Sequence, residues 1–137
     1  MVSNPINQIK EIGQSVWYDD LSRELILSGS LEKLVQRGIT GVTSNPSIFN
    51  KAISSGNEYD SSLNKLNQKQ FNIQQIYENL AIEDIKNAAD ILKPVYDKTN
   101  MKDGYVSLEV NPHFANDISS TISEAENLLH ELNKSNV

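Results

Sequence analysis

The stretch Gly41-Val42-Thr43-Ser44-Asn45-Pro46-Ser47-Ile48-Phe49 decides the fold class of this 137-residue chain. Apolar and β-branched residues precede Pro46, which has no N–H to continue a ladder but suits the first turn of a helix. The stretch therefore predicts a strand, a sharp turn and a helix. A polar amide such as Asn45, at the carboxyl end of a strand, is where α/β proteins place ligand-binding groups. On these residues alone, the simpler interpretation is that Asn45 or Ser47 caps the helix.

One further strand is predicted on each side of this stretch. Residues 15–19 are rich in β-formers, and their alternation puts Trp17 and Asp19 on one face. Residues 105–110 alternate apolar side chains, which we expect to face helices, with a mixed set made of Tyr105, Ser107 and Glu109. Helical segments separate the three strands and no β-hairpin signal occurs, a pattern typical of parallel βαβ units.

Parity along these strands predicts a polar cluster at one end of the sheet. Asp19, Asn45 and Glu109 fall on interior-facing positions at the carboxyl ends of three successive strands. Two carboxylates and an amide at one mouth are suited to acid–base chemistry and to binding hydroxyl groups. The competing interpretation is that these side chains simply end their strands.

The helices that matter most for the fold lie in the second half of the chain. Apolar side chains recur with a 3.6-residue period from residue 73 to residue 96, which predicts the longest helix, with Pro94 at a kink or in the final turns. Residues 64–72 are polar and predict a loop. A last helix is expected to begin at Asp117 or Ser119. It is expected to bury an apolar stripe made of Ile118, Ile122, Ala125, Leu128 and Leu129.

Composition excludes several classes of function. A net charge of -6 argues against nonspecific nucleic-acid binding, which needs a basic face. The absence of cysteine excludes a disulfide scaffold, a thiol nucleophile and a cysteine-ligated metal, and two histidines leave little for a histidine site. No apolar run approaches the roughly 18 residues of a membrane span, and residues 1–13 lack the apolar core of a secretory signal. We expect a cytoplasmic protein.

Three motifs, in this order and at this spacing, resemble those of transaldolases, which are sugar-phosphate enzymes built on a (β/α)8 barrel. The motifs are residues 13–19 (GQSVWYD), residues 41–49 (GVTSNPSIF) and residues 103–110 (DGYVSLEV). The resemblance implies an α/β fold, a partial TIM (β/α)8 barrel with about the first three βα units and extra helices between strands 2 and 3. A complete barrel usually needs about 250 residues, so residues 1–137 would form the amino-terminal portion of a single barrel.

The resemblance also implies an activity in the pentose phosphate pathway. Transaldolases move a dihydroxyacetone unit from sedoheptulose 7-phosphate to glyceraldehyde 3-phosphate through a lysine Schiff base, giving erythrose 4-phosphate and fructose 6-phosphate without a cofactor. Matched motif by motif, Asp19 would exchange a proton with the sugar hydroxyl, and Glu109 would act through a water as the imine forms and is hydrolysed. Asn45 would hold a substrate hydroxyl, and Thr43 and Ser107 would join it in binding substrate.

The Schiff-base lysine is not expected within this chain. None of its lysines falls in a predicted strand, and Val137 lies a few residues before the family's lysine would be reached. We therefore expect the chain alone to be inactive, whether the stop is natural, a frameshift or an experimental boundary. A noncatalytic βα module that assembles with a partner is one alternative. A related Schiff-base sugar-phosphate aldolase is another.

An opened barrel also predicts assembly. The first and third strands would each lack one neighbour, which leaves residues 16–19 and 105–110 as open edges, and open edges invite pairing. We expect a homodimer or a complex with a complementing carboxyl-terminal half, and no nucleic-acid or membrane partner.

Overall fold

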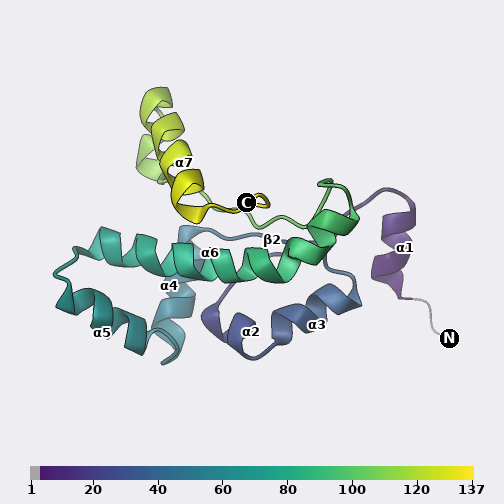
Figure 1. Cartoon of the computed structure of the whole chain (residues 1–137), viewed down its shortest axis with the longest axis horizontal. Helices are drawn as coiled ribbons and strands as arrows, with labels where there is room; N and C mark the ends of the chain where they lie inside the picture. Colours follow the sequence, from purple (N-terminus) through teal and green to yellow (C-terminus); the bar gives the residue numbers. More distant parts are fainter. Residues whose placement is uncertain (1–3) are drawn as a thin grey trace.

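The computed structural model describes residues 4–137 and is a mostly helical α/β structure with a two-stranded parallel sheet (Figure 1). In chain order its elements are α1 (Pro5–Glu11), β1 (Trp17–Tyr18), α2 (Arg23–Leu27), α3 (Ser30–Arg37), β2 (Gly41–Val42), α4 (Pro46–Ser55), α5 (Asp60–Gln68), α6 (Ile73–Lys98), the 3-10 helix η1 (Pro112–Phe114) and α7 (Ile118–Leu132). No helix within residues 4–137 has both the length and the apolar character needed to cross a membrane.

The sheet has the predicted parallel order. β1 pairs with β2 in the register Trp17 opposite Gly41 and Tyr18 opposite Val42. Val42 forms a further parallel bridge with Val106. The Val42 N–H donates to the Tyr105 carbonyl at 3.1 Å, and the Val42 carbonyl accepts the Ser107 N–H at 2.9 Å. Residues 105–107 therefore lie beside β2, on the side opposite to β1.

The predicted strand 105–110 is wrong in its length, because only Val106 pairs in a bridge. The ladder stops where side chains replace backbone partners: the Ser44 hydroxyl donates to the Ser107 carbonyl at 2.6 Å, and the Ser44 N–H donates to the Ser107 hydroxyl at 3.3 Å. A few residues later Pro112 begins η1, and proline has no N–H for a ladder. The extended segment therefore leaves β2 after Ser107.

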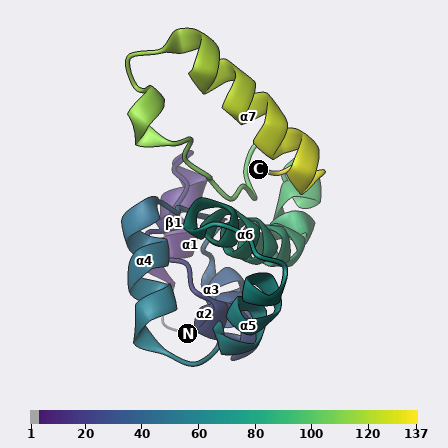
Figure 2. The same ribbon diagram turned by 90° about the vertical axis from the view of Figure 1, so that its left-hand side faces the viewer.

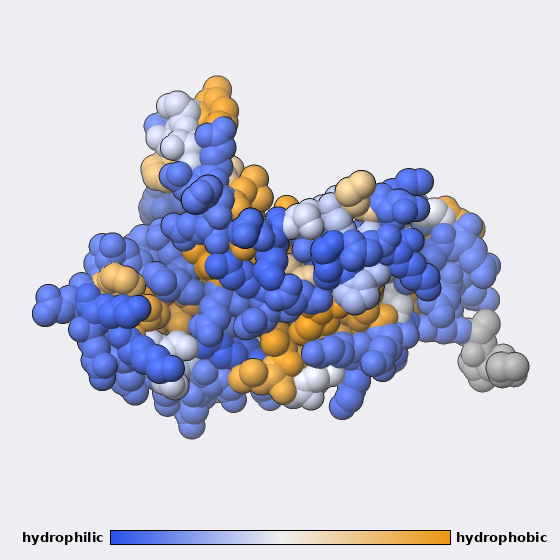
Figure 3. All heavy atoms as spheres, in the orientation of Figure 1, coloured by the Kyte–Doolittle hydropathy of each residue, from blue (hydrophilic) through white to orange (hydrophobic). Residues whose placement is uncertain are grey.

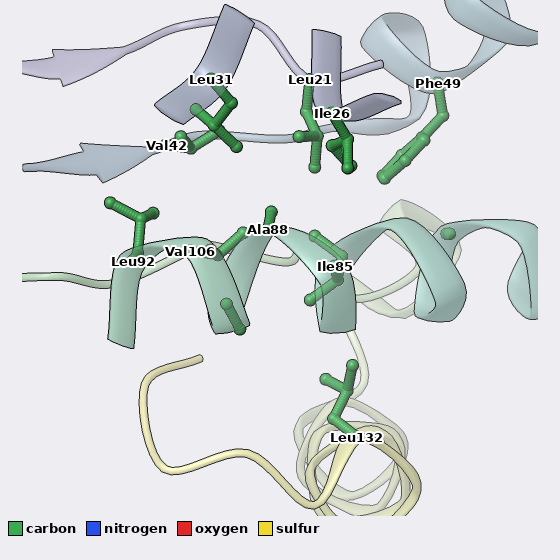
Figure 4. Close-up of a cluster of buried hydrophobic side chains, with 12 residues drawn as sticks. Leu21, Ile26, Leu31, Val42, Phe49, Ile85, Ala88, Leu92, Val106 and Leu132 are labelled. Atoms are coloured by element: carbon green, nitrogen blue, oxygen red, sulfur yellow. The ribbon is translucent and has the colours of Figure 1, made fainter. Parts of the chain in front are cut away.

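The core lies between the sheet and α6, the 26-residue helix that spans the molecule. Val42 and Val106 are fully buried on the helix-covered face of the sheet, as the alternation predicts for Val106. In Figure 4 the side chains of α2, α3 and α4 meet those of α6 across this layer. The helix runs from an Asn72 capping box to Lys98, so Pro94 falls in its final turns.

The carboxyl end of the chain covers part of an edge that was expected to be open. The Val106 N–H donates to the Asn136 carbonyl at 3.0 Å, on the side away from β2. The Asn136 amide donates to the carbonyls of Ala89 and Gly104 at 2.8 and 3.0 Å, and Val137 packs against the core. The last two residues therefore cover the edge at Val106.

Two helix predictions fail. The predicted loop 64–72 is mostly helix, since α5 continues to Gln68.

For α7 the cap at Asp117 is confirmed, but the apolar stripe is largely uncovered: Ile118, Ile122 and Leu129 are 80%, 54% and 51% exposed. The helix projects from the body and packs on α6 through its last turn, where Leu132 is buried (Figures 1 and 2). Apolar atoms are accordingly visible on the projecting helix in Figure 3.

Candidate active site

Val42 and Val106 pack toward α6, and the opposite face of the sheet is the one that we call the open face (Ser15, Trp17, Asp19, Gly41, Thr43, Tyr105 and Ser107). Trp17 is 37% exposed, and its indole lies directly over Gly41. A Cβ at position 41 would come within 2.3 Å of the indole carbons Cδ2 and Cε2, so this position requires glycine. The indole thus covers the middle of the open face, and polar groups lie at both ends of the strands.

At the amino ends of the strands, Asp103 joins the outer two segments. Its carboxylate, in a residue only 8% exposed, accepts hydrogen bonds from the Ser15 hydroxyl, from Trp17 Nε1 at 3.0 Å and from the Gly104 N–H at 3.0 Å. Burial alone would raise the pKa of Asp103, but hydrogen bonds, first from Ser15 and then from Thr40, hold this pKa below its usual value. Asp103 opens the third motif, but the sequence patterns predict no role for it. In the structure it orients the Trp17 indole.

At the carboxyl ends of the strands, three predicted site residues come together. The Thr43 hydroxyl donates to Asp19 Oδ1 at 2.5 Å. Since Tyr18, Val42 and Val106 are in register, Asp19, Thr43 and Ser107 follow them as neighbours in one layer of the open face. Asp19 is exposed and Thr43 is half-buried. The layer therefore presents a carboxylate and two hydroxyls to solvent.

Asn45 combines a structural and an accessible group. Its backbone is extended, with φ -152°, and its Oδ1 accepts the Ile48 N–H at 2.9 Å, so it is the N-cap of α4 with Pro46 as the first helical residue. The simpler interpretation of Asn45 is thereby confirmed for the oxygen. Its Nδ2 donates to no group within residues 4–137, which leaves this N–H pair for a ligand.

Glu109 is separate from the other four predicted residues. It is exposed, and no hydrogen bond or ion pair within the described chain joins it to Asp19, Asn45, Thr43 or Ser107. Instead it lines a cavity of about 510 Å³ together with Tyr77 and Leu108. Burial raises the pKa of Tyr77, and the negative charge of Glu109 raises it further. The carboxylate thus lies where residues 108–111 have left the sheet.

Within residues 4–137, the open face carries no lysine and no cluster of side chains suited to a metal ion. Every lysine of the chain lies in residues 4–137, in a helix or in a segment outside β1, β2 and residues 105–107. Lys134, the last of them, pairs with Asp90 of α6 at 2.5 Å. Within the same described range, no group of three or more His, Asp or Glu side chains is arranged to hold a metal ion. The open face itself therefore offers acid–base and hydrogen-bonding groups.

Comparison with known proteins identifies the family of the chain. The family model for transaldolase/fructose-6-phosphate aldolase matches residues 16–137. The transaldolase 2 of Nostoc punctiforme is 46% identical over 138 residues, which cover 100% of this chain and 36% of that relative. The transaldolase 2 of Streptomyces coelicolor is 42% identical over 128 residues, which cover 93% of this chain and 34% of that relative. The chain thus spans about a third of the length of these relatives. It belongs to the transaldolase/fructose-6-phosphate aldolase family.

Proposed function

We propose that this chain supplies part of the active site of a cytoplasmic transaldolase of the pentose phosphate pathway, a transferase that moves a dihydroxyacetone unit between sugar phosphates. The observation that carries the proposal is the hydrogen bond from Thr43 to Asp19 at the carboxyl end of the sheet, in a chain of this family. The three parallel segments fit the first three strands of a (β/α)8 barrel. The helices α4 and α5 are then the insertion between the second and third strands.

Asp19 acts in this proposal as the general acid and base. One carboxylate oxygen, Oδ1, is held by Thr43, which leaves Oδ2 to exchange a proton with a sugar hydroxyl as the carbon–carbon bond breaks or forms. The free Nδ2 of Asn45 donates to a substrate oxygen, and the hydroxyl of Ser107 lies in the same layer as Asp19. Glu109 assists through a water as the imine forms and is hydrolysed.

The nucleophile in this proposal is a lysine outside residues 1–137. An iminium formed on a lysine accepts the electron pair of the breaking bond, so the reaction needs no metal for that purpose. The pairing of the last residues with Val106 supports a position for this lysine on the open face. Val106 donates to Asn136, so Val137 stands opposite Val106, and a chain running on in parallel would put its first and third residues on the open face. Those two positions lie level with Ser107 and Glu109.

A chimera tests the proposal. Residues 1–137 of this chain replace the corresponding segment of the Nostoc punctiforme transaldolase 2, which aligns with the whole chain. The chimera is expected to transfer a dihydroxyacetone unit from fructose 6-phosphate to erythrose 4-phosphate. The 137-residue chain alone is expected to be inactive, because no lysine lies on its open face. A folded chimera without activity would contradict the proposal.

We also propose that the chain by itself associates, with a second copy or with a complementing carboxyl-terminal half. The exposed apolar side chains of α7 and the edge of β1 that does not face β2 support this, because such surfaces favour association. Size exclusion coupled to light scattering of the chain alone at micromolar concentration is expected to give a species larger than the monomer. A monodisperse monomer with cooperative thermal unfolding would refute the association.

A further inference from the structure

A charged cluster with a buried centre connects α2, α5 and α6, and we call it the arginine cluster (Arg23, Tyr59, Ser62, Glu83 and Asp84). Arg23 is 7% exposed, Tyr59 is 1% exposed and Asp84 is fully buried. The guanidinium donates from Nε to Asp84 Oδ1 at 2.8 Å, from Nη1 to the Ser62 hydroxyl at 2.7 Å and from Nη2 to Glu83 Oε2 at 2.7 Å. Each nitrogen of the guanidinium therefore has a partner on α5 or α6.

The Tyr59 hydroxyl is the centre of this cluster. It donates to Asp84 Oδ2 at 2.7 Å and accepts the backbone N–H of Arg23 at 3.0 Å. The Arg23 guanidinium also stacks on the Tyr59 ring, with Cζ 4.6 Å from the ring centroid. Because the hydroxyl binds the main chain at the first residue of α2, it fixes backbone as well as side chains.

That backbone leads directly to Asp19. Tyr18 is fixed upstream, since its carbonyl accepts the Thr43 N–H at 3.0 Å. Leu21 is fully buried in the core, and the Ser22 hydroxyl caps α2 by accepting the Leu25 N–H at 3.1 Å. The segment 19–22 is thus held at the sheet, at the core and, through Arg23, at the arginine cluster.

We propose that the arginine cluster is a positioning device for Asp19, through which the inserted helix α5 sets the direction of the carboxylate at the mouth of the sheet. The consequence of this positioning for catalysis rests on the proposed function of Asp19. The cluster itself touches no residue of the open face, so Tyr59 and Arg23 are positioning residues. A purely structural role would lower stability without moving the Asp19 carboxylate in the folded state.

Tyr59→Phe tests the proposal, because it keeps the ring over Arg23 and removes only the hydroxyl. Tyr77→Phe is the control, since it removes a hydroxyl from another tyrosine, which is half-buried on α6 and makes no hydrogen bond to the arginine cluster within residues 4–137. Nuclear magnetic resonance on the labelled 137-residue chain reports hydrogen exchange at the Arg23 amide and the chemical shift of the Asp19 carboxyl carbon. Tyr59→Phe is expected to speed exchange at Arg23 about tenfold, as the loss of one hydrogen bond does, and to shift the Asp19 signal.

The expected result is that Tyr77→Phe leaves both signals unchanged. Unchanged signals in folded Tyr59→Phe, or equal changes in both variants, would overturn the proposal. If Tyr59→Phe does not fold, Ser62→Ala takes its place. It removes the 2.7 Å bond from Arg23 Nη1 and the 3.4 Å bond to Glu83 Oε2, and it is expected to shift the Asp19 signal in the same direction. In the chimera, Tyr59→Phe is expected to lower kcat more than it changes KM. An inactive unsubstituted chimera would refute the proposed function and leave the resonance test of the positioning intact.

Discussion

Asp19→Ala in the chimera is expected to lower kcat by more than about 10²-fold, because positioned acid–base groups typically contribute about 10²–10⁴-fold. The substitution removes the carboxylate that accepts the Thr43 hydroxyl on the open face. Asp20→Ala is the matched control, since Asp20 is the next residue along the chain and makes no hydrogen bond to the open face within residues 4–137. Steady-state kinetics with fructose 6-phosphate as donor measure the effect.

The other two site residues extend this prediction. Glu109→Ala is expected to lower kcat by a similar factor through slower imine formation and hydrolysis, although Glu109 has no contact with Asp19 in the chain alone. Asn45→Ala is expected to change both kcat and KM, because the side chain would bind substrate and also caps α4. Wild-type rates for Asp19→Ala would show that this carboxylate ends a strand and does nothing more.

Asp84→Ala is expected to lower the free energy of unfolding by about 3–5 kcal/mol, the usual cost of removing one partner from a buried ion pair. Asp84 is fully buried, and its loss would leave the Arg23 guanidinium, itself in a residue 7% exposed, without its fully buried partner. It would also leave the Tyr59 hydroxyl without an acceptor. Burial raises the pKa of Asp84. The bonds from Tyr59 and Arg23 oppose that rise, because they stabilise the charged carboxylate.

Urea denaturation measures this loss. Asp97→Ala is the control, because Asp97 is 62% exposed in an ion pair with Lys93 on the same helix, and exposed pairs contribute about 0–1 kcal/mol. Similar losses for Asp84→Ala and Asp97→Ala would mean that the arginine cluster is no more important than a surface pair.

The parts of the fold that follow from local periodicity could be predicted from the sequence. The length and apolar face of α6, the turn at Asn45-Pro46 and the parallel order of the three segments all follow from patterns within a few residues. The adjacency of Asp19 and Thr43 follows from the same patterns, because parity and parallel register together put both on one face. The role of Asp103, the first residue of the third motif, could not be predicted, because its contacts are with residues 15 and 17, far away in the sequence.

The errors arise where a pattern depends on a partner elsewhere in space. Helical periodicity tells which side of α7 is apolar, but it carries no information about what covers that side, so Ile118 and Ile122 are exposed against expectation. Likewise the alternation in residues 105–110 predicts a strand, while its length is set by Ser44, whose side chain replaces a ladder bond. The arginine cluster joins Arg23 to residues 36 to 61 positions away, and no local pattern reports such contacts.

The most direct test of the central claim, that this chain supplies the acid–base groups of a transaldolase site whose lysine lies elsewhere, is trapping with borohydride. The chain alone and the chimera are each incubated with fructose 6-phosphate, reduced with borohydride and measured by intact-mass spectrometry and peptide mapping. We expect a covalent sugar adduct in the chimera only, on a lysine outside residues 1–137. A stoichiometric adduct on a lysine of the 137-residue chain, such as Lys134, would contradict it.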